Sequence, residues 1–241
     1  MTASTHAAEF AGQTFTAPAA RSDRMRDIVV AEAPRTAIRV LDLGCGTGSL
    51  VARLAETMPD ATVVGIDVSA ANIDAARRAV QGSRVRFDDV DYRQFSADPF
   101  DVIVSDGVLH LMAGDTAELI GKLARDVRPG GLFICDMPYA CAYNTAFAFV
   151  RRSLRAIRAP WLDHVILRVA RLLHGREMGL DALRERVGYM YIPPERVMDA
   201  DLLDAFGAAG FRRRADHDAP STSLSQLRHR VTVFVRDVSA R

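Results

Sequence analysis

The sequence predicts an α/β protein with a doubly wound, mostly parallel sheet of seven strands and a helical segment inserted after the fifth strand. Short apolar runs of the length of buried strands alternate with segments of helical periodicity over most of the chain. This alternation stops after residue 137, where helical periodicity continues without a strand signal to about residue 194. The length of 241 residues suits one domain that carries such an insertion.

The core is expected to begin with a helix and a βαβ unit. Residues 19–30 have a helical composition, and 38–43 form an apolar run of the kind found in buried parallel strands. Glycines interrupt the chain directly after this run, and helical spacing resumes over 49–56. A second apolar run, 62–66, ends at the acidic residue Asp67. Strand, glycine turn, helix and strand together make a βαβ unit.

The same alternation predicts three more strands. Helical spacing over 69–80 is followed by strand-like runs at 85–87 and 102–105. A helix over 117–127 is expected to end at an Arg-Pro-Gly-Gly turn, which leads into a fifth strand at 132–136.

The chain is therefore expected to divide into three parts. Residues 1–137 form a ligand-binding core with an N-terminal lid helix, residues 138–196 form a helical cap over the carboxyl edge of the sheet, and residues 197–241 return to the core. The returning part is expected to contain a helix at 197–209 and strands near 211–215 and 231–235.

Composition and charge exclude several classes of protein. Hydrophobic residues make up 49% of the chain, which excludes general disorder, and 31 basic against 30 acidic residues create no field that attracts nucleic acid. We find no secretion signal and no apolar run long enough to span a membrane. Cys45, Cys135 and Cys141 are too few for a disulfide framework. A cytoplasmic protein is the expectation.

The glycine turn after the first strand has the character of a nucleotide-binding loop. Gly44, Gly46 and Gly48 lack Cβ atoms, so their backbone can approach a ligand closely. Asp67, at the end of the next strand, can hold ribose hydroxyls with its carboxylate. The third glycine comes one residue too early for the G-x-G-x-x-G loop of dinucleotide dehydrogenases, which disfavours hydride transfer.

Four segments carry a family resemblance: "VLDLGCGTGSL", "VVGIDVS", "FDVIVSDGVLHLM" and "LARDVRPGGLFI". Their order and spacing resemble those of class I S-adenosylmethionine-dependent methyltransferases over roughly residues 20–137, and in outline from residue 197. The resemblance implies the Rossmann-like methyltransferase fold, with S-adenosyl-L-methionine as co-substrate. The inserted segment is not covered by it.

The resemblance also implies which residues contact S-adenosylmethionine. The methionine portion would lie beside Asp42, Gly44, Cys45, Gly46 and Ser105. The ribose and adenine would lie beside Asp67, Val68, Asp91 and Tyr92. On the N-terminal helix, Arg21 and Arg24 are candidates to pair with the carboxylate of the cofactor, and solvated surface arginines are the alternative.

Four residues are candidates for catalysis. His110 follows the fourth strand and is expected at the rim of the pocket, as a base, an orienting group or a packing residue. Tyr139, Asn144 and Tyr189 of the insertion can bind substrate or face the sulfonium, unless they form the core of the cap. Asp106, beside His110, is expected to form a turn. No histidines have metal-ligand spacing, so we expect metal-independent, in-line transfer.

Residues 151–176 form an unusually basic part of the insertion. They contain seven arginines and one acid, Asp163, with apolar residues at helical spacing. The favoured interpretation is a cap or homodimer face with a solvated arginine edge. Contact with an anionic membrane or an acidic carrier protein stays open.

These observations predict an enzyme that methylates a small-molecule acceptor at oxygen, nitrogen or sulfur. An alternative of the same fold resembles azetidine-2-carboxylate synthases, which cyclise part of the cofactor and release methylthioadenosine. A second alternative is a cofactor-binding regulatory subunit without activity. The sequence does not identify the acceptor.

Overall fold

A computed structural model describes residues 14–34, 38–174, 179–218 and 226–238. Its seven strands form one sheet in the order β3-β2-β1-β4-β5-β7-β6. The strands are β1 (Arg39–Leu43), β2 (Thr62–Asp67), β3 (Val85–Asp89), β4 (Phe100–Asp106), β5 (Val127–Pro138), β6 (Phe211–Asp218) and β7 (His229–Arg236). Strand β7 runs antiparallel to both of its neighbours, β5 and β6, and the other paired strands are parallel. The predicted seven-stranded, mostly parallel sheet is confirmed.

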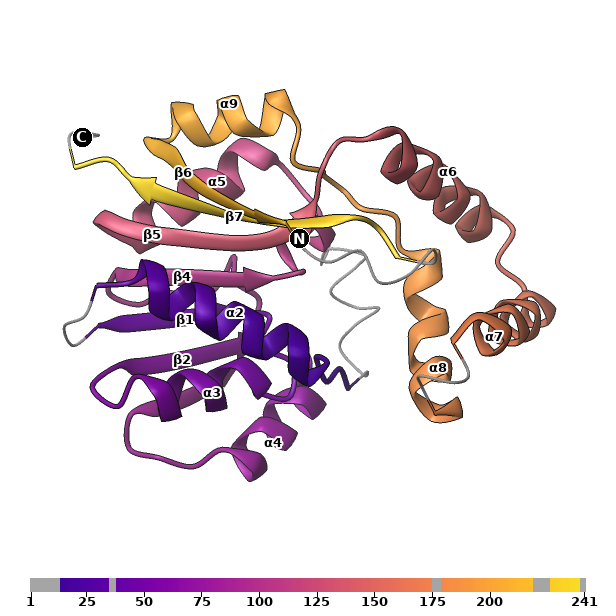
Figure 1. The fold of residues 1–241 in the computed structure, drawn as a ribbon, viewed down its shortest axis with the longest axis horizontal. Coiled ribbons are helices and arrows are strands. Elements are labelled where there is room, and N and C mark those ends of the chain that lie inside the picture. Colours follow the sequence, from indigo (N-terminus) through magenta and orange to yellow (C-terminus); the bar gives the residue numbers. More distant parts are fainter. Residues whose placement is uncertain (1–13, 35–37, 175–178, 219–225, 239–241) are drawn as a thin grey trace.

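Helices cover both faces of this sheet (Figure 1). One face carries α2 (Ala19–Glu32), α3 (Ser49–Thr57) and α4 (Ala70–Ala79). The other face carries α5 (Thr116–Asp126) and α9 (Ala200–Ala208). Successive residues of β1 enter different cores, since Val40 packs on the α2 face and Leu41 on the α5 face. Burial on both faces explains why Val40, Leu41 and Leu43 are all apolar, with Asp42 as the one buried charged residue of the strand.

Side-chain caps set where several helices begin. Ser69, Asp115 and Asp199 each accept a hydrogen bond from the backbone N–H three residues further on, at the start of α4, α5 and α9. The predicted start of the last helix at Val197 is therefore wrong. Met198 forms an isolated β-bridge with Tyr139, and the helix begins after Asp199.

The predicted start of the fifth strand is also wrong. Strand β5 begins at Val127, and the Arg-Pro-Gly-Gly segment lies inside it as an irregularity. The register with β4 shifts between the pairs Phe100–Val127 and Val102–Leu132. The extra residues of β5 make the pairing irregular at this point, where Gly130 has a positive φ of 78°.

The inserted segment between β5 and α9 is helical. It contains α6 (Ala142–Ala156), α7 (Pro160–His174), α8 (Leu180–Val187) and the 3-10 helix η2 (Gly188–Tyr191). These helices lie beyond the carboxyl ends of the parallel strands, and α7 is the element farthest from the sheet (Figure 1). Helix α7 packs against α8, and α6 contacts η2. None of the helices described is long and apolar enough to cross a membrane.

Candidate functional site

The glycine loop between β1 and α3 is fixed tightly to its neighbours. Its glycines have positive φ angles: 78° at Gly44, 53° at Gly46 and 82° at Gly48. A Cβ atom on Gly44 would lie 2.3 Å from Cγ2 of Val108, so no side chain fits there. The N–H groups of Gly44 and Cys45 donate to the carbonyl of Ile66, at 2.8 and 2.9 Å. The loop is thus held at the carboxyl ends of β1 and β2.

Asp67, the last residue of β2, connects this loop to helix α4. Its Oδ2 accepts the N–H of Gly46 at 2.9 Å, and its Oδ1 accepts the N–H of Ser69 at 2.9 Å. The side-chain amide of Asn72 also donates to Oδ1, at 3.2 Å. A carboxylate offers about four acceptor positions, so Asp67 keeps capacity for a hydroxyl of a ligand.

The segment before α2 lies directly over the loop. The carbonyl of Phe15 accepts the N–H of Thr47 at 3.1 Å, and the N–H of Phe15 donates to Oδ1 of Asn72 at 2.7 Å. A Cβ atom on Gly46 would lie 2.5 Å from the same Phe15 carbonyl. A ligand in the loop must therefore share this space with Phe15 or move it.

Three side chains predicted to face the methionine portion of the cofactor are buried near the loop. Burial, followed by the charges of Asp106 and Asp67, raises the pKa of Asp42 well above its usual value. This shift favours the protonated carboxyl, which can donate a hydrogen bond as well as accept one. Burial also raises the pKa of the Cys45 thiol. The hydroxyl of Ser105 accepts the N–H of Leu109 at 3.1 Å.

The residues predicted to bind adenine lie after β2 and β3. Val68 is half-buried. The Asp91 carboxylate accepts the N–H of Arg93 at 2.9 Å and so stabilises the turn after β3. The Tyr92 ring is buried, with the ammonium of Lys122 4.6 Å from its centroid, so its side chain belongs to the core. The prediction that the backbone N–H of Tyr92 contacts a ligand stays a prediction.

A cluster of charged groups lies where β4 and β5 end. Arg21 of α2 donates from Nε to Asp106 at 2.7 Å and from Nη2 to Asp136 at 2.9 Å. Nδ1 of His229 lies 3.3 Å from the Asp136 carboxylate, and the ring of His229 meets that of His110 edge-on at 5.1 Å. The expectation that Asp106 forms a turn is wrong, because it ends β4 and pairs with Arg21.

Burial and neighbouring charges shift the pKa values of Asp106 and Asp136 in opposite directions. Burial raises the pKa of Asp106, although the Arg21 guanidinium opposes the shift. Burial also acts to raise the pKa of Asp136, but the hydrogen bond and charge of His229, together with Arg21, outweigh it and lower that pKa.

The environment of His110 favours the neutral form of its imidazole. This residue lies in the 3-10 helix η1 (Leu109–Leu111) and is 5% exposed. Burial, and then the positive charges around it, lower its pKa well below 6.5. Its Nδ1 has no hydrogen-bond partner among the residues that the structure describes. A buried nitrogen without a partner is a candidate to orient a substrate group.

The other arginine of the N-terminal helix lies differently. Arg24 donates from Nη2 to the backbone carbonyl of His217 on β6, at 2.9 Å. Arg21, rather than Arg24, contacts the carboxylates at the ends of β4 and β5. The predicted role of Arg24 toward the cofactor stays a prediction.

The three predicted catalytic residues of the insertion differ in their surroundings. Asn144 is buried and donates to the carbonyls of Tyr139 and Arg228, at 2.7 and 2.8 Å, while its Oδ1 accepts the N–H of Arg228 at 2.7 Å. These bonds use both amide hydrogens of Asn144, so a substrate could contact this side chain without displacing them only through the second lone pair of Oδ1. The Tyr139 ring lies 4.8 Å from the guanidinium of Arg230. The side chain of Tyr189 falls outside the described part of the chain.

Arg151 is a candidate that the sequence analysis did not single out. It is 9% exposed, donates to the carbonyl of Ile192 at 3.1 Å and lies 5.0 Å from the Phe147 ring. Its Nε has no partner, and no acid pairs with it, within the described residues. Burial lowers its pKa to about 10. Its spacing from the buried Asn144 and Ala148, on one face of α6, is the signal that could have identified it.

Comparisons with known proteins match the core of the chain. Residues 40–131 match the family model described as a methyltransferase domain. A trans-aconitate 2-methyltransferase from Deinococcus radiodurans is 38% identical over 119 residues, which cover 49% of this chain and 45% of that protein. The chain thus spans about half the length of such curated relatives. A ubiquinone biosynthesis O-methyltransferase from Maricaulis maris is 29% identical over 67% of this chain and 66% of its own length.

Solved structures extend the likeness of the fold beyond the core. The magnesium protoporphyrin IX methyltransferase from Synechocystis, solved with bound S-adenosylhomocysteine, superposes with a TM-score of 0.61. It is 19% identical, over 91% of this chain and 83% of that one. Its sheet-and-helix arrangement therefore includes the region after residue 131. Together, these findings show a methyltransferase domain at residues 40–131, and they support the predicted resemblance to class I S-adenosylmethionine-dependent methyltransferases.

Proposed function

We propose that the protein transfers the methyl group of S-adenosylmethionine to a small-molecule acceptor. The observation that carries this proposal is the hydrogen bond from the glycine loop to the Asp67 carboxylate, at the carboxyl ends of β1 and β2. In open α/β sheets this edge is where ligands bind, and the loop and the acid lie inside the matched methyltransferase domain. The residues present fit the co-substrate, because Asp67 has acceptor capacity left for a ribose hydroxyl.

The cofactor contacts follow the order of the strands. Asp67 and Val68 would hold the ribose and one face of the adenine, with Asp91 and the backbone of Tyr92 beyond them. The methionine portion would lie beside Asp42, Gly44, Cys45, Gly46 and Ser105, and Arg21 would reach its carboxylate by exchanging a partner. When bound, S-adenosylmethionine supplies a methyl group already activated by its sulfonium.

We further propose that the acceptor is a carboxylate. Arg151 is a buried guanidinium without an acidic partner among the described residues. Its positive charge helps to lower the pKa of His110. A buried cation of this kind is costly unless an anion joins it. A carboxylate acceptor would fill that place and would need no base, which agrees with the lowered pKa of His110, because a lowered pKa makes the imidazole a weak base. The relatives named for trans-aconitate, a tricarboxylate, support the same class.

In this proposal the remaining side chains position the acceptor. His110 would offer its unpaired Nδ1, and Tyr139 and Tyr189 would offer hydroxyls or ring faces. Asn144 would hold the start of α6, because its amide is engaged by backbone groups. Residues 138–196 would act as the cap that selects the acceptor above the core of 1–137 and 197–241. An ionised carboxylate is a sufficient nucleophile, so the proposed step uses no metal ion.

The test uses trans-aconitate as a probe, with S-adenosylhomocysteine formation as the readout. Arg151→Gln should lower kcat/KM for the acid at least about tenfold, because a charge-assisted contact contributes about 1.5–3 kcal/mol. Arg152→Gln is the matched control, since Arg152 is the exposed neighbour on the same helix. Equal activity of the two variants would reject Arg151 as the acceptor contact. If polycarboxylates and simple carboxylates are never methylated while other acceptors are, the carboxylate class is wrong.

A further inference from the structure

The outer side of α7 exposes a row of large apolar side chains. Trp161 is 62% exposed, Val165 45%, Val169 51% and Leu172 86%. At 100° per residue these four positions fall within one narrow sector of the helix, which we call the outer stripe. Exposed apolar side chains in a contiguous row are uncommon unless another surface covers them.

The described residues of the inserted segment leave this stripe exposed. Leu162, which borders the stripe next to Val169, is buried at 8% exposure, and α7 packs against α8, so the packed side of the helix begins where the stripe ends. Helix α7 is the outermost element of the fold (Figure 1). Within the part of the chain that the structure describes, the stripe is therefore uncovered and available to a partner.

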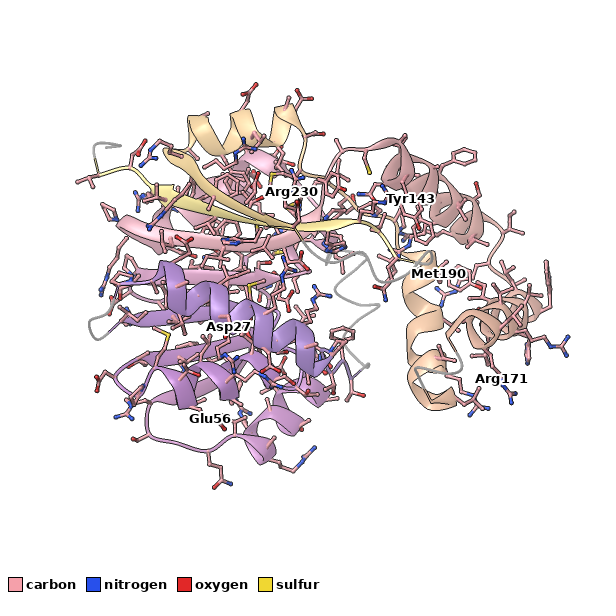
Figure 2. All side chains as sticks on the ribbon, in the orientation of Figure 1. Asp27, Glu56, Tyr143, Arg171, Met190 and Arg230 are labelled. Carbon is pink, nitrogen blue, oxygen red and sulfur yellow. The ribbon has the colours of Figure 1, made fainter. Side chains whose placement is uncertain are left out.

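Arginines accompany the outer stripe. Helical geometry places Arg168 and Arg171 on one flank of it, and both are exposed. Figure 2 shows Arg171 at the outer margin of the molecule, whereas Tyr143 and Met190 lie nearer the sheet. Asp163 is the one acid between residues 142 and 174, and its carboxylate accepts the hydroxyl of Tyr191 at 2.5 Å. The surface around the stripe is thus positively charged.

We propose that α7 docks on an anionic lipid bilayer, with the outer stripe in the headgroup region and the arginines on the lipid phosphates. A helix with an apolar sector that contains Trp and Leu, flanked by basic residues, is the kind that lies in a membrane interface. Its 15 residues extend about 22 Å, too short to span the bilayer.

Charge distinguishes this partner from a second copy of the chain. Two such stripes packed together would bring Arg168 and Arg171 of one copy toward the arginines of the other, with Asp163 as the one nearby acid and already bonded. An anionic surface instead complements every arginine on the flank. The docked helix belongs to the segment beyond the carboxyl ends of the strands, so the bilayer would lie on the acceptor side of the molecule.

The chain contains a built-in probe for this contact, because Trp161 is its one tryptophan. Unilamellar vesicles of equal parts phosphatidylcholine and phosphatidylglycerol should shift its emission to shorter wavelength and should carry the full-length protein into the pellet. Vesicles of phosphatidylcholine alone should bind it far more weakly. Added salt should release the protein, because ions screen the attraction.

Exposed substitutions test the two parts of the surface without disturbing the core. The double variant Arg168→Gln/Arg171→Gln should weaken binding to anionic vesicles at least about tenfold, and Leu172→Gln should also weaken it. Arg212→Gln/Arg213→Gln on strand β6 is the matched control, since it removes the same charge from another exposed site. That control should lower binding by less than about threefold.

Three results would overturn the proposal. The first is the absence of both binding and an emission shift with anionic vesicles. The second is an emission shift that appears without vesicles, grows with protein concentration and accompanies a dimer in sedimentation equilibrium, which would assign the stripe to self-association. The third is equal loss of binding in the control and in the α7 variant, which would show that overall charge alone acts. None of these readouts depends on methyl transfer.

Discussion

Replacing Asp67 with alanine removes the carboxylate that joins the glycine loop to β2 and is proposed to hold the ribose. Its oxygens accept hydrogen bonds from Gly46, Ser69 and Asn72 at 2.9–3.2 Å, so the same group fixes the loop and meets the ligand. Each charge-assisted hydrogen bond to a ribose hydroxyl contributes about 1.5–3 kcal/mol before compensation by water. A net loss of about 1.4 kcal/mol lowers affinity tenfold. We expect at least that loss for S-adenosylmethionine in isothermal titration calorimetry.

The control for this variant is Asp89→Ala. Asp89 ends β3, is paired in register with Asp67 and is exposed, so its removal changes the charge of the same edge without touching the loop. The affinity of this control should stay within about twofold of the parent, a change below about 0.4 kcal/mol. If Asp67→Ala stays folded by circular dichroism and binds S-adenosylmethionine as tightly as the parent, the assignment of this carboxylate is refuted.

Two further predictions concern His110 and Asn144. In the unfolded chain His110 takes up a proton near pH 6.5, whereas in the folded protein its pKa lies well below that value. The unfolded state therefore binds more protons below pH 6.5, and the free energy of unfolding should fall there by up to about 1.4 kcal/mol per pH unit. In urea titrations, the free energy of unfolding of His110→Gln should depend less on pH than that of the parent. An unchanged pH dependence would show that burial of His110 is not its cause. Asn144→Ala should lower the free energy of unfolding by about 1–3 kcal/mol, because buried backbone groups of Tyr139 and Arg228 lose their partner. As the control, Thr145→Ala at the exposed neighbouring position should change the free energy of unfolding by less than about 0.5 kcal/mol. Equal losses of stability in the two variants would show that the hydrogen bonds of Asn144 do not stabilise the fold.

Local patterns were sufficient to predict the sheet and the loop. The apolar runs at β1 and β2 and the glycines between them act over a few residues, and their arrangement follows from the handedness of βαβ units. The starts of α4 and α5 are equally local, because Ser69 and Asp115 cap the helices that follow them. Features of this kind can be predicted without knowing what lies elsewhere in the chain.

The charged cluster depends on contacts that local patterns do not contain. Arg21 meets Asp106 across 85 positions and Asp136 across 115, and His229 reaches Asp136 only because β7 pairs antiparallel with β5. The sequence predicted an amphipathic α7, but periodicity alone does not say which sector is covered. The structure shows that the sector with Trp161 and Leu172 faces outward.

The most direct test of the account is the identity of the product formed from the co-substrate. The purified protein is incubated with S-adenosylmethionine alone and with an acceptor, and the products are separated and quantified by mass spectrometry. Methyl transfer predicts almost no turnover without acceptor, and S-adenosylhomocysteine in equal amount to methylated product when acceptor is added. Cyclisation of the co-substrate needs no second substrate, because the attacking amine is tethered to the sulfonium. Stoichiometric methylthioadenosine from S-adenosylmethionine alone, formed well above its spontaneous decay, would contradict methyl transfer and assign the chain to the cyclising enzymes of this fold.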